Sequence, residues 1–151
     1  MATMTEGDRK LGEVRRDVEA TLGLVPEWAE HVPASALSGL WSLMKDFELA
    51  ETKIPGKYKE LIGLAVAGAT RCRYCALFHT EAAKLNGATE EEIAEASMLG
   101  GFSMAVSTFL NAQQIDYGKF RDETLKIVEF VRAAQAKAGS SASKGSARAH
   151  A

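Results

Sequence analysis

The sequence has little of what marks several protein classes. Only two cysteines and three prolines occur among 151 residues, so no framework of structural disulfides is present. The N-terminus lacks the basic and then apolar regions of a secretory signal. The apolar run from Leu61 to Ala69 is far shorter than the roughly 20 residues that span a bilayer. We therefore expect a cytoplasmic protein without a membrane-spanning segment.

Neither an excess of charge nor a long polar tract marks the main part of the chain. Hydrophobic residues make up 46% and charged residues 25%, as in ordinary globular domains. The net charge is −2 and no basic stripe is present, which argues against nucleic-acid binding. We expect one domain over residues 1–138. Residues 139–151 form a low-complexity tail that we expect to be disordered.

The periodicity predicts an all-α fold, a single-domain helical bundle. Apolar residues recur at intervals of three and four, and no stretch alternates strictly over the length of a strand. Asp8, Ser35 and Thr89 are suitable N-caps, while Gly23 and Gly87 are suitable helix ends. The expected helices cover about residues 8–22, 26–31, 35–47, 57–70, 71–86, 89–112 and 117–137. The pair Gly100-Gly101 either breaks the sixth helix or lets a neighbour pack closely.

The helix from Lys57 to Thr70 presents two different faces. The inward face is expected to carry Tyr58, Leu61, Ile62, Ala65, Val66 and Ala69. Glu60 lies off that stripe, and the positions three, four and seven residues further on are Gly63, Leu64 and Ala67. This second face has little bulk, so another helix or a reactive group can come near Glu60.

The segment from Cys72 to His79 contains both cysteines and one of the three histidines. On a helix, steps of three, four and seven residues place Cys72, Cys75 and His79 on one face. Two thiols at this spacing can form a reversible disulfide, bind a soft metal such as zinc together with His79 and Glu60, or lie inert in a core.

The surroundings of the thiols favour reactivity. A thiol reacts as the thiolate, and a helix N-terminus with nearby cations lowers its pKa from about 8.5. Cys72 lies near the predicted N-terminus between Arg71 and Arg73. Cys75 lies one turn further on, with His79 as a possible base.

Glu60, then Cys72-x-x-Cys75 twelve residues later, then His79, resembles the alkylhydroperoxidase D-like group of the carboxymuconolactone decarboxylase superfamily. The resemblance covers about residues 25–116. Further matching parts are Leu24-Val25-Pro26, Lys59-Glu60-Leu61-Ile62 and Leu85-Asn86-Gly87-Ala88-Thr89. It implies an all-helical subunit whose cysteine helix lies against the glutamate helix, assembled into a trimer, a hexamer or another homo-oligomer.

The resemblance also implies a peroxidase mechanism that requires no cofactor. Cys75, the more enclosed thiol, would attack a hydroperoxide, and Cys72, nearer solvent, would resolve the product to a disulfide. Glu60 and His79, with water, would relay the proton. A dithiol reductant of the lipoyl or thioredoxin type would restore the thiols. The sequence departs from the family pattern at Tyr74, where a second histidine is usual, so Tyr74 is either a relay or orienting group or a partly buried aromatic residue.

Three other functions fit parts of the pattern. Zinc could be bound by Cys72, Cys75 and His79 with Glu60 or water. The protein could be a redox sensor with little turnover. A muconolactone-type decarboxylase is the third alternative, although that branch lacks paired cysteines.

Overall fold

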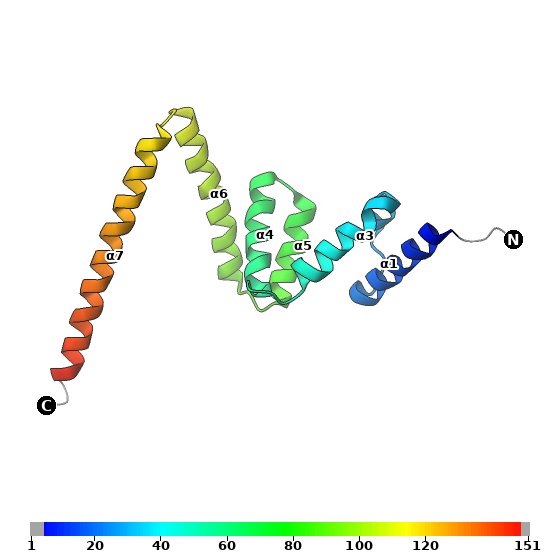
Figure 1. The fold of residues 1–151 in the computed structure, drawn as a ribbon, viewed down its shortest axis with the longest axis horizontal. Coiled ribbons are helices and arrows are strands. Elements are labelled where there is room, and N and C mark those ends of the chain that lie inside the picture. Colours follow the sequence, from blue (N-terminus) through cyan, green and yellow to red (C-terminus); the bar gives the residue numbers. More distant parts are fainter. Residues whose placement is uncertain (1–4, 149–151) are drawn as a thin grey trace. The chain divides into compact units, whose positions relative to one another are not determined.

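The computed structural model describes the backbone of residues 5–148 and the side chains of residues 5–137. This part of the chain forms seven α-helices and one π-helical turn, η1, and contains no strand (Figure 1). The all-α prediction is confirmed. The elements are α1 (Glu6–Leu22), α2 (Glu27–His31), α3 (Ala34–Leu43), η1 (Met44–Leu49), α4 (Gly56–Thr70), α5 (Arg73–Leu85), α6 (Glu90–Ala112) and α7 (Tyr117–Arg148).

The chain separates into two compact units, Met1–Phe102 and Ser103–Ala151. The division falls inside α6. The first unit holds the two cysteines, Glu60 and His79, so the site lies within it. That residues 1–138 form one domain stays a prediction.

The first helix is capped differently from the prediction. Thr5 is the N-cap, and its hydroxyl accepts the backbone N–H of Asp8 while the Asp8 carboxylate accepts the backbone N–H of Thr5. This reciprocal pair is a capping box, and Asp8 is its third helical residue rather than the cap. Gly23 ends α1 with φ of 82°, a left-handed conformation that glycine adopts without steric cost, as predicted. Helix α3 begins after Pro33 without a side-chain cap, so Ser35 does not cap it.

The centre of the first unit is the pair α4 and α5, which lie side by side (Figure 1). Leu64 of α4, Ala83 of α5 and Ile93 of α6 form its buried cluster. Three partly buried side chains pack against that cluster: Leu61, Ala76 and Ala88. Half of these side chains are alanines, which lets the helix axes approach closely.

Half of the predicted inward face of α4 is exposed in the single chain, whereas Leu61, Ala65 and Ala69 are partly buried. Tyr58, Ile62 and Val66 are 51%, 53% and 54% exposed. The buried residues of α4 are instead Glu60, Leu64 and Ala67. The small-residue face packs because it permits close helix approach, and the bulkier side chains of Tyr58, Ile62 and Val66 remain uncovered.

Helix α6 begins with the predicted capping box. The Thr89 hydroxyl accepts the Glu92 backbone N–H, and the Glu92 carboxylate accepts the Thr89 backbone N–H. The helix continues through Gly100-Gly101, and a Cβ at Gly100 would fall 2.7 Å from the backbone oxygen of Ala65. Gly100 therefore serves close packing rather than a break.

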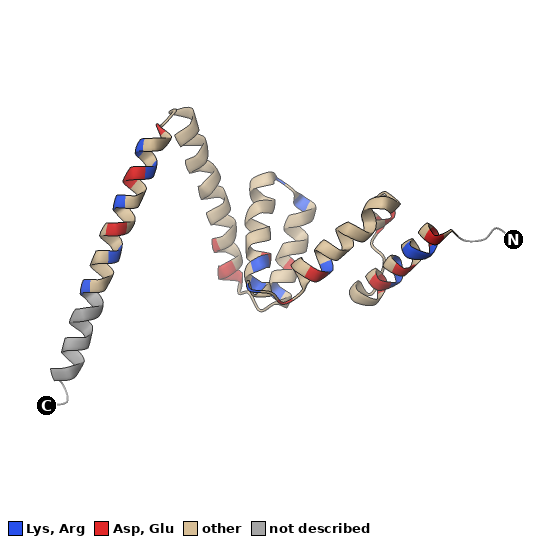
Figure 2. Ribbon diagram, viewed as in Figure 1, with Lys and Arg blue, Asp and Glu red and all other residues tan. Residues whose placement is uncertain are grey.

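Beyond Glu95, α6 carries no charged residue (Figure 2). By length and composition alone, Glu90–Ala112 could cross a membrane. This is weak evidence, because a helix covered by other protein surfaces meets the same criteria. The absence of a membrane span stays a prediction.

Charged residues recur along α7 (Figure 2). Its backbone is helical to Arg148, beyond the end near Lys137 that the sequence predicts. The side chains of residues 138–148 and all of residues 149–151 lie outside the described part. Disorder of residues 139–151 therefore stays a prediction.

Candidate functional site

The two cysteines form a disulfide where α5 begins. Their Sγ atoms are 2.20 Å apart and their Cα atoms 5.4 Å apart. Helix α5 begins at Arg73, two residues later than predicted, because Arg71 takes a left-handed conformation with φ of 59° and Cys72 becomes the N-cap. The Cys72 sulfur accepts the backbone N–H of Cys75 at 3.2 Å. The helix start thus holds both sulfurs together.

The sequence predicts that Cys75 is more enclosed than Cys72, and the structure shows the reverse. Cys72 is half-buried, whereas Cys75 is exposed in the single chain. Cys72 lies in the turn that joins α4 to α5, where the backbone of Ala67 accepts its N–H. Cys75 lies within the first turn of α5 on its open side. The prediction that Cys75 is the more enclosed thiol is therefore wrong for this chain.

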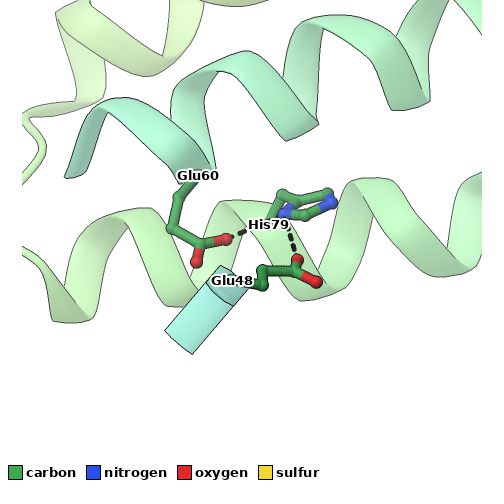
Figure 3. A group of neighbouring side chains, drawn as sticks. All are labelled: Glu48, Glu60 and His79. Carbon is green, nitrogen blue, oxygen red and sulfur yellow. Dashed lines mark hydrogen bonds and ion pairs between the residues drawn. The ribbon is translucent and has the colours of Figure 1, made fainter. Parts of the chain in front are cut away.

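One turn beyond Cys75, His79 points toward α4 and meets Glu60 (Figure 3). His79 Nδ1 lies 2.8 Å from Glu60 Oε2, and the Glu60 side chain is only 2% exposed. A buried carboxylate needs such a partner, because leaving it unpaired would be strongly unfavourable. An ionised Glu60 accepts the proton on Nδ1 and leaves Nε2 of the neutral ring as an acceptor.

Gly63 makes room for this pair. A Cβ placed on Gly63 would fall 2.6 Å from His79 Nε2, closer than packed atoms allow. Any side chain at this position would displace the imidazole. The expectation that the small-residue face of α4 admits a reactive group is confirmed here, and the group is His79.

Glu48 is a site residue that the sequence did not indicate. It comes from η1, and its Oε1 lies 3.8 Å from His79 Nδ1, on the same ring nitrogen as Glu60 (Figure 3). The sequence gave no reason to select it, since Glu48 is one of 20 acidic residues and belongs to no motif. Only the packing of η1 near α4 and α5 reveals it.

Lys59 fixes the segment that carries Glu48. Its Nζ donates to the backbone oxygens of Phe47 and Ala50, the latter at 2.7 Å. These carbonyls lie at the end of η1, where helix geometry leaves acceptors without partners. Lys59 precedes Glu60 in the chain, so one turn of α4 supplies Glu60 and anchors Glu48.

Tyr74 does not join this group. Its ring is 73% exposed, and its hydroxyl accepts Arg73 Nη2 at 2.9 Å. The Arg73 guanidinium also lies over the ring, 4.9 Å from its centroid. These contacts place Tyr74 on the surface with Arg73, away from the contacts of Glu60 and His79. A role in proton transfer stays a prediction.

The residues that could hold a metal ion differ from the set weighed from the sequence. Each of Glu48, Glu60 and His79 offers a ligand atom, and these atoms lie within 4.8 Å of one another. The sulfurs of Cys72 and Cys75 are bonded to each other and are not free ligands in this form. The direct contact between His79 and Glu60 already satisfies both groups without an ion.

An ion pair near the start of α4 joins it to α6. Lys57 Nζ lies 2.7 Å from Glu92 Oε1, and this hydrogen bond raises the pKa of Lys57. The same bond, followed by the capping bond from Thr89, lowers the pKa of Glu92. The pair ties the first turns of both helices together.

Comparisons with known proteins agree with the fold. The sequence model described as "Carboxymuconolactone decarboxylase family" matches residues 36–115, more than half of the chain. Among solved structures, the crystal structure of the alkylhydroperoxidase AhpD core from Rhodospirillum rubrum is similar, with a TM-score of 0.62 and 28% identity. The match covers 77% of this chain and 93% of that one. A comparison with curated protein sequences gives no match.

The chain therefore belongs to the carboxymuconolactone decarboxylase family, and within that superfamily it is a member of the alkylhydroperoxidase D-like type. The predicted family and fold are confirmed.

Proposed function

We propose that this protein is a thiol-dependent peroxidase that reduces hydroperoxides through Cys72 and Cys75. The observation that carries the proposal is the disulfide one helical turn before His79, whose ring is bound to the buried Glu60. A reversible dithiol beside a histidine and carboxylate pair is suited to proton-coupled thiol oxidation. The family assignment and the likeness to an alkylhydroperoxidase core support the same chemistry.

The reaction has three balanced steps. The Cys75 thiolate attacks the outer peroxide oxygen, so the O–O bond breaks, Cys75 becomes a sulfenic acid and an alcohol leaves with the thiol's proton. The Cys72 thiol then attacks the sulfenic sulfur, forming the disulfide and releasing water. Finally a dithiol donor reduces the disulfide, its two protons and two electrons passing to the cysteine pair while the donor becomes a disulfide.

The contacts support an assigned role for each residue. Cys75 is exposed, which gives a peroxide direct access to its sulfur, and it lies one turn from His79. Cys72 is already positioned to reach Cys75. His79 receives the thiol proton, directly or through water, and Glu60 orients its ring and stabilises the imidazolium. The donor is a lipoyl-type or thioredoxin-like dithiol, and the reducing cytoplasm is the compartment where such a pair turns over.

We also propose that the protein functions as a homo-oligomer, either a trimer or a hexamer. Tyr58, Ile62 and Val66 form an exposed face of α4. In the uncharged stretch of α6, Met98, Leu99 and Phe102 are 74%, 61% and 62% exposed. Exposed apolar surface of this extent is typical of a protein-protein interface. A second copy of the chain would cover it.

Replacing Cys75 with Ser tests the proposed chemistry. We expect sustained hydroperoxide consumption, with dihydrolipoamide or thioredoxin as donor, to fall to the uncatalysed rate, because the nucleophile is lost. The matched Cys72→Ser variant should complete one oxidation and accumulate a sulfenic acid that dimedone traps. Undiminished turnover by Cys75→Ser would contradict the proposal. A fast single oxidation of the wild-type protein without sustained reduction would indicate a redox sensor instead.

A further inference from the structure

Two carboxylates face one nitrogen of His79. Glu60 from α4 lies 2.8 Å from Nδ1, and Glu48 from η1 lies 3.8 Å from the same atom (Figure 3). One acceptor satisfies the Nδ1 proton, so the second carboxylate is not needed for hydrogen bonding. Both carboxylates are placed to interact with a charge that develops on the imidazole when the ring receives a proton.

The exposure of the side chains increases from Glu60 through His79 to Glu48. The side chains of Glu60, His79 and Glu48 are 2%, 16% and 35% exposed. Glu60 is therefore the enclosed partner of the ring, and Glu48 is the partner nearer solvent. These two are the acidic groups that pair with His79 in the described part of the chain, one from each element that meets α5 here.

The backbone around Glu48 is held in a specific conformation. It lies in a π-helical turn, a rare geometry that recurs at functional sites. Lys59 Nζ donates to the backbone oxygen of Ala50 at 2.7 Å and to the backbone oxygen of Glu48 at 3.5 Å. The cation is thus directed to the backbone, and the Glu48 carboxylate remains directed toward His79.

We propose that Glu48 is a positioning residue of the proton relay that acts through His79. This inference rests on the proposed peroxidase function. When the Cys75 S–H bond breaks, the proton forms an N–H bond at His79 Nε2, directly or through water. Glu48 stabilises this imidazolium together with Glu60 until the N–H bond breaks and the proton passes to the alkoxide oxygen, giving the alcohol.

The expected effect is moderate because Glu48 is partly exposed. A charge pair at 3.8 Å in a partly screened site changes an equilibrium by a factor of about five. Removing Glu60, which is buried and in direct contact, should have a much larger effect, about 100-fold on rate.

The test is the pH profile of the single oxidation of reduced protein by a hydroperoxide, measured by stopped flow. Glu48→Gln should oxidise about fivefold more slowly at neutral pH, its profile should move to higher pH, and its rate should approach the wild-type rate in alkali. Glu48→Asp should restore part of the rate. Asp46→Asn is the matched control, because Asp46 is an exposed acid on the same turn, and it should leave the profile unchanged.

Two results would overturn the role of Glu48: a profile equal to that of Asp46→Asn, or a rate lowered equally at every pH, which indicates a structural effect. If the wild-type protein does not react with peroxide, the proposed function fails separately. The same variants are then compared in their attack on a small aromatic disulfide, which requires the same thiolate. An unchanged pH profile in that reaction also rejects the inference.

Discussion

The two faces of α4 differ in burial, and the more apolar face is the more exposed one. The face with Glu60 and Gly63 is packed against α5 and η1, although it contains a carboxylate and little apolar bulk. The face with Ile62 and Val66 is bulkier and more apolar, yet each of these side chains is about half exposed. Apolar content alone did not determine which face is buried within the chain.

The difference shows two kinds of packing in one helix. Within the chain, small residues let α5 approach until His79 reaches Glu60, and that hydrogen bond compensates the burial of the carboxylate. The bulky face is suited to burial against another surface, since exposed Ile62 and Val66 retain a driving force for association. One face therefore builds the site, and we propose that the other builds the assembly.

Filling the small face should have the largest effect on the folded chain. Gly63→Ala places a methyl group where the His79 ring lies, so we expect a loss of about 1–3 kcal/mol in unfolding free energy and a markedly slower peroxide reaction. Urea unfolding and the peroxide assay measure the two effects.

Gly68→Ala on the same helix is the matched control, because nothing lies within 4 Å of its Cβ position. Alanine there should stabilise α4 by about 0.5–1 kcal/mol. Equal effects of the two substitutions would show that Gly63 does not make room for His79.

A charge on the bulky face should affect assembly rather than folding. Val66→Glu introduces a carboxylate at a side chain that is 54% exposed. The unfolding free energy of the single chain should change by no more than about 0.5 kcal/mol, while the oligomer dissociates because the charge would be buried without a partner. Light scattering after size exclusion gives the mass. Glu51→Lys, at an exposed position outside α4, is the control, and an unchanged mass for Val66→Glu would place the interface elsewhere.

The smallest expected effect concerns the ion pair between Lys57 of α4 and Glu92 of α6. Because Lys57 and Thr89 lower the pKa of Glu92 in the folded protein, its ionised form stabilises the fold above the unfolded-state pKa of about 4.3. This contribution is lost as pH falls through the lower folded-state pKa. Glu92→Gln should lower the melting temperature slightly at pH 7.

The melting temperatures of Glu92→Gln and the wild-type protein should converge near pH 3. Glu95→Gln, which removes an exposed acid from the same helix, should show a smaller difference at pH 7. A constant difference for Glu92→Gln across the pH range would mean that the lost capping contact, and not ionisation, is responsible.

Local chemistry allowed much of the fold to be predicted. The glycine at the end of α1, the capping box of Thr89 and Glu92, and the helices on both sides of the cysteine turn follow from nearby residues. Helix starts were less accurate, since Thr5 rather than Asp8 caps α1 and Cys72 itself caps α5. Neighbouring side chains and backbone strain decide such positions, which periodicity does not resolve.

The site was partly predictable for the same reason. Cys72, Cys75 and His79 lie within eight residues, so their proximity follows from helix geometry. The structure then brought Glu60 to His79, as the resemblance implied, but showed Cys75 to be the more exposed thiol. The exposure of a side chain depends on what packs above it, which its spacing in the sequence does not specify.

The sequence by itself determined the helical fold, the paired thiols and the small face of α4, because these depend on contacts a few residues apart. Only the tertiary structure decided that the small face is the buried one, that Tyr74 lies with Arg73, and that Glu48 meets His79. The last contact joins residues 31 positions apart on separate elements. It depends on the packing of η1, α4 and α5 together, which no local pattern encodes.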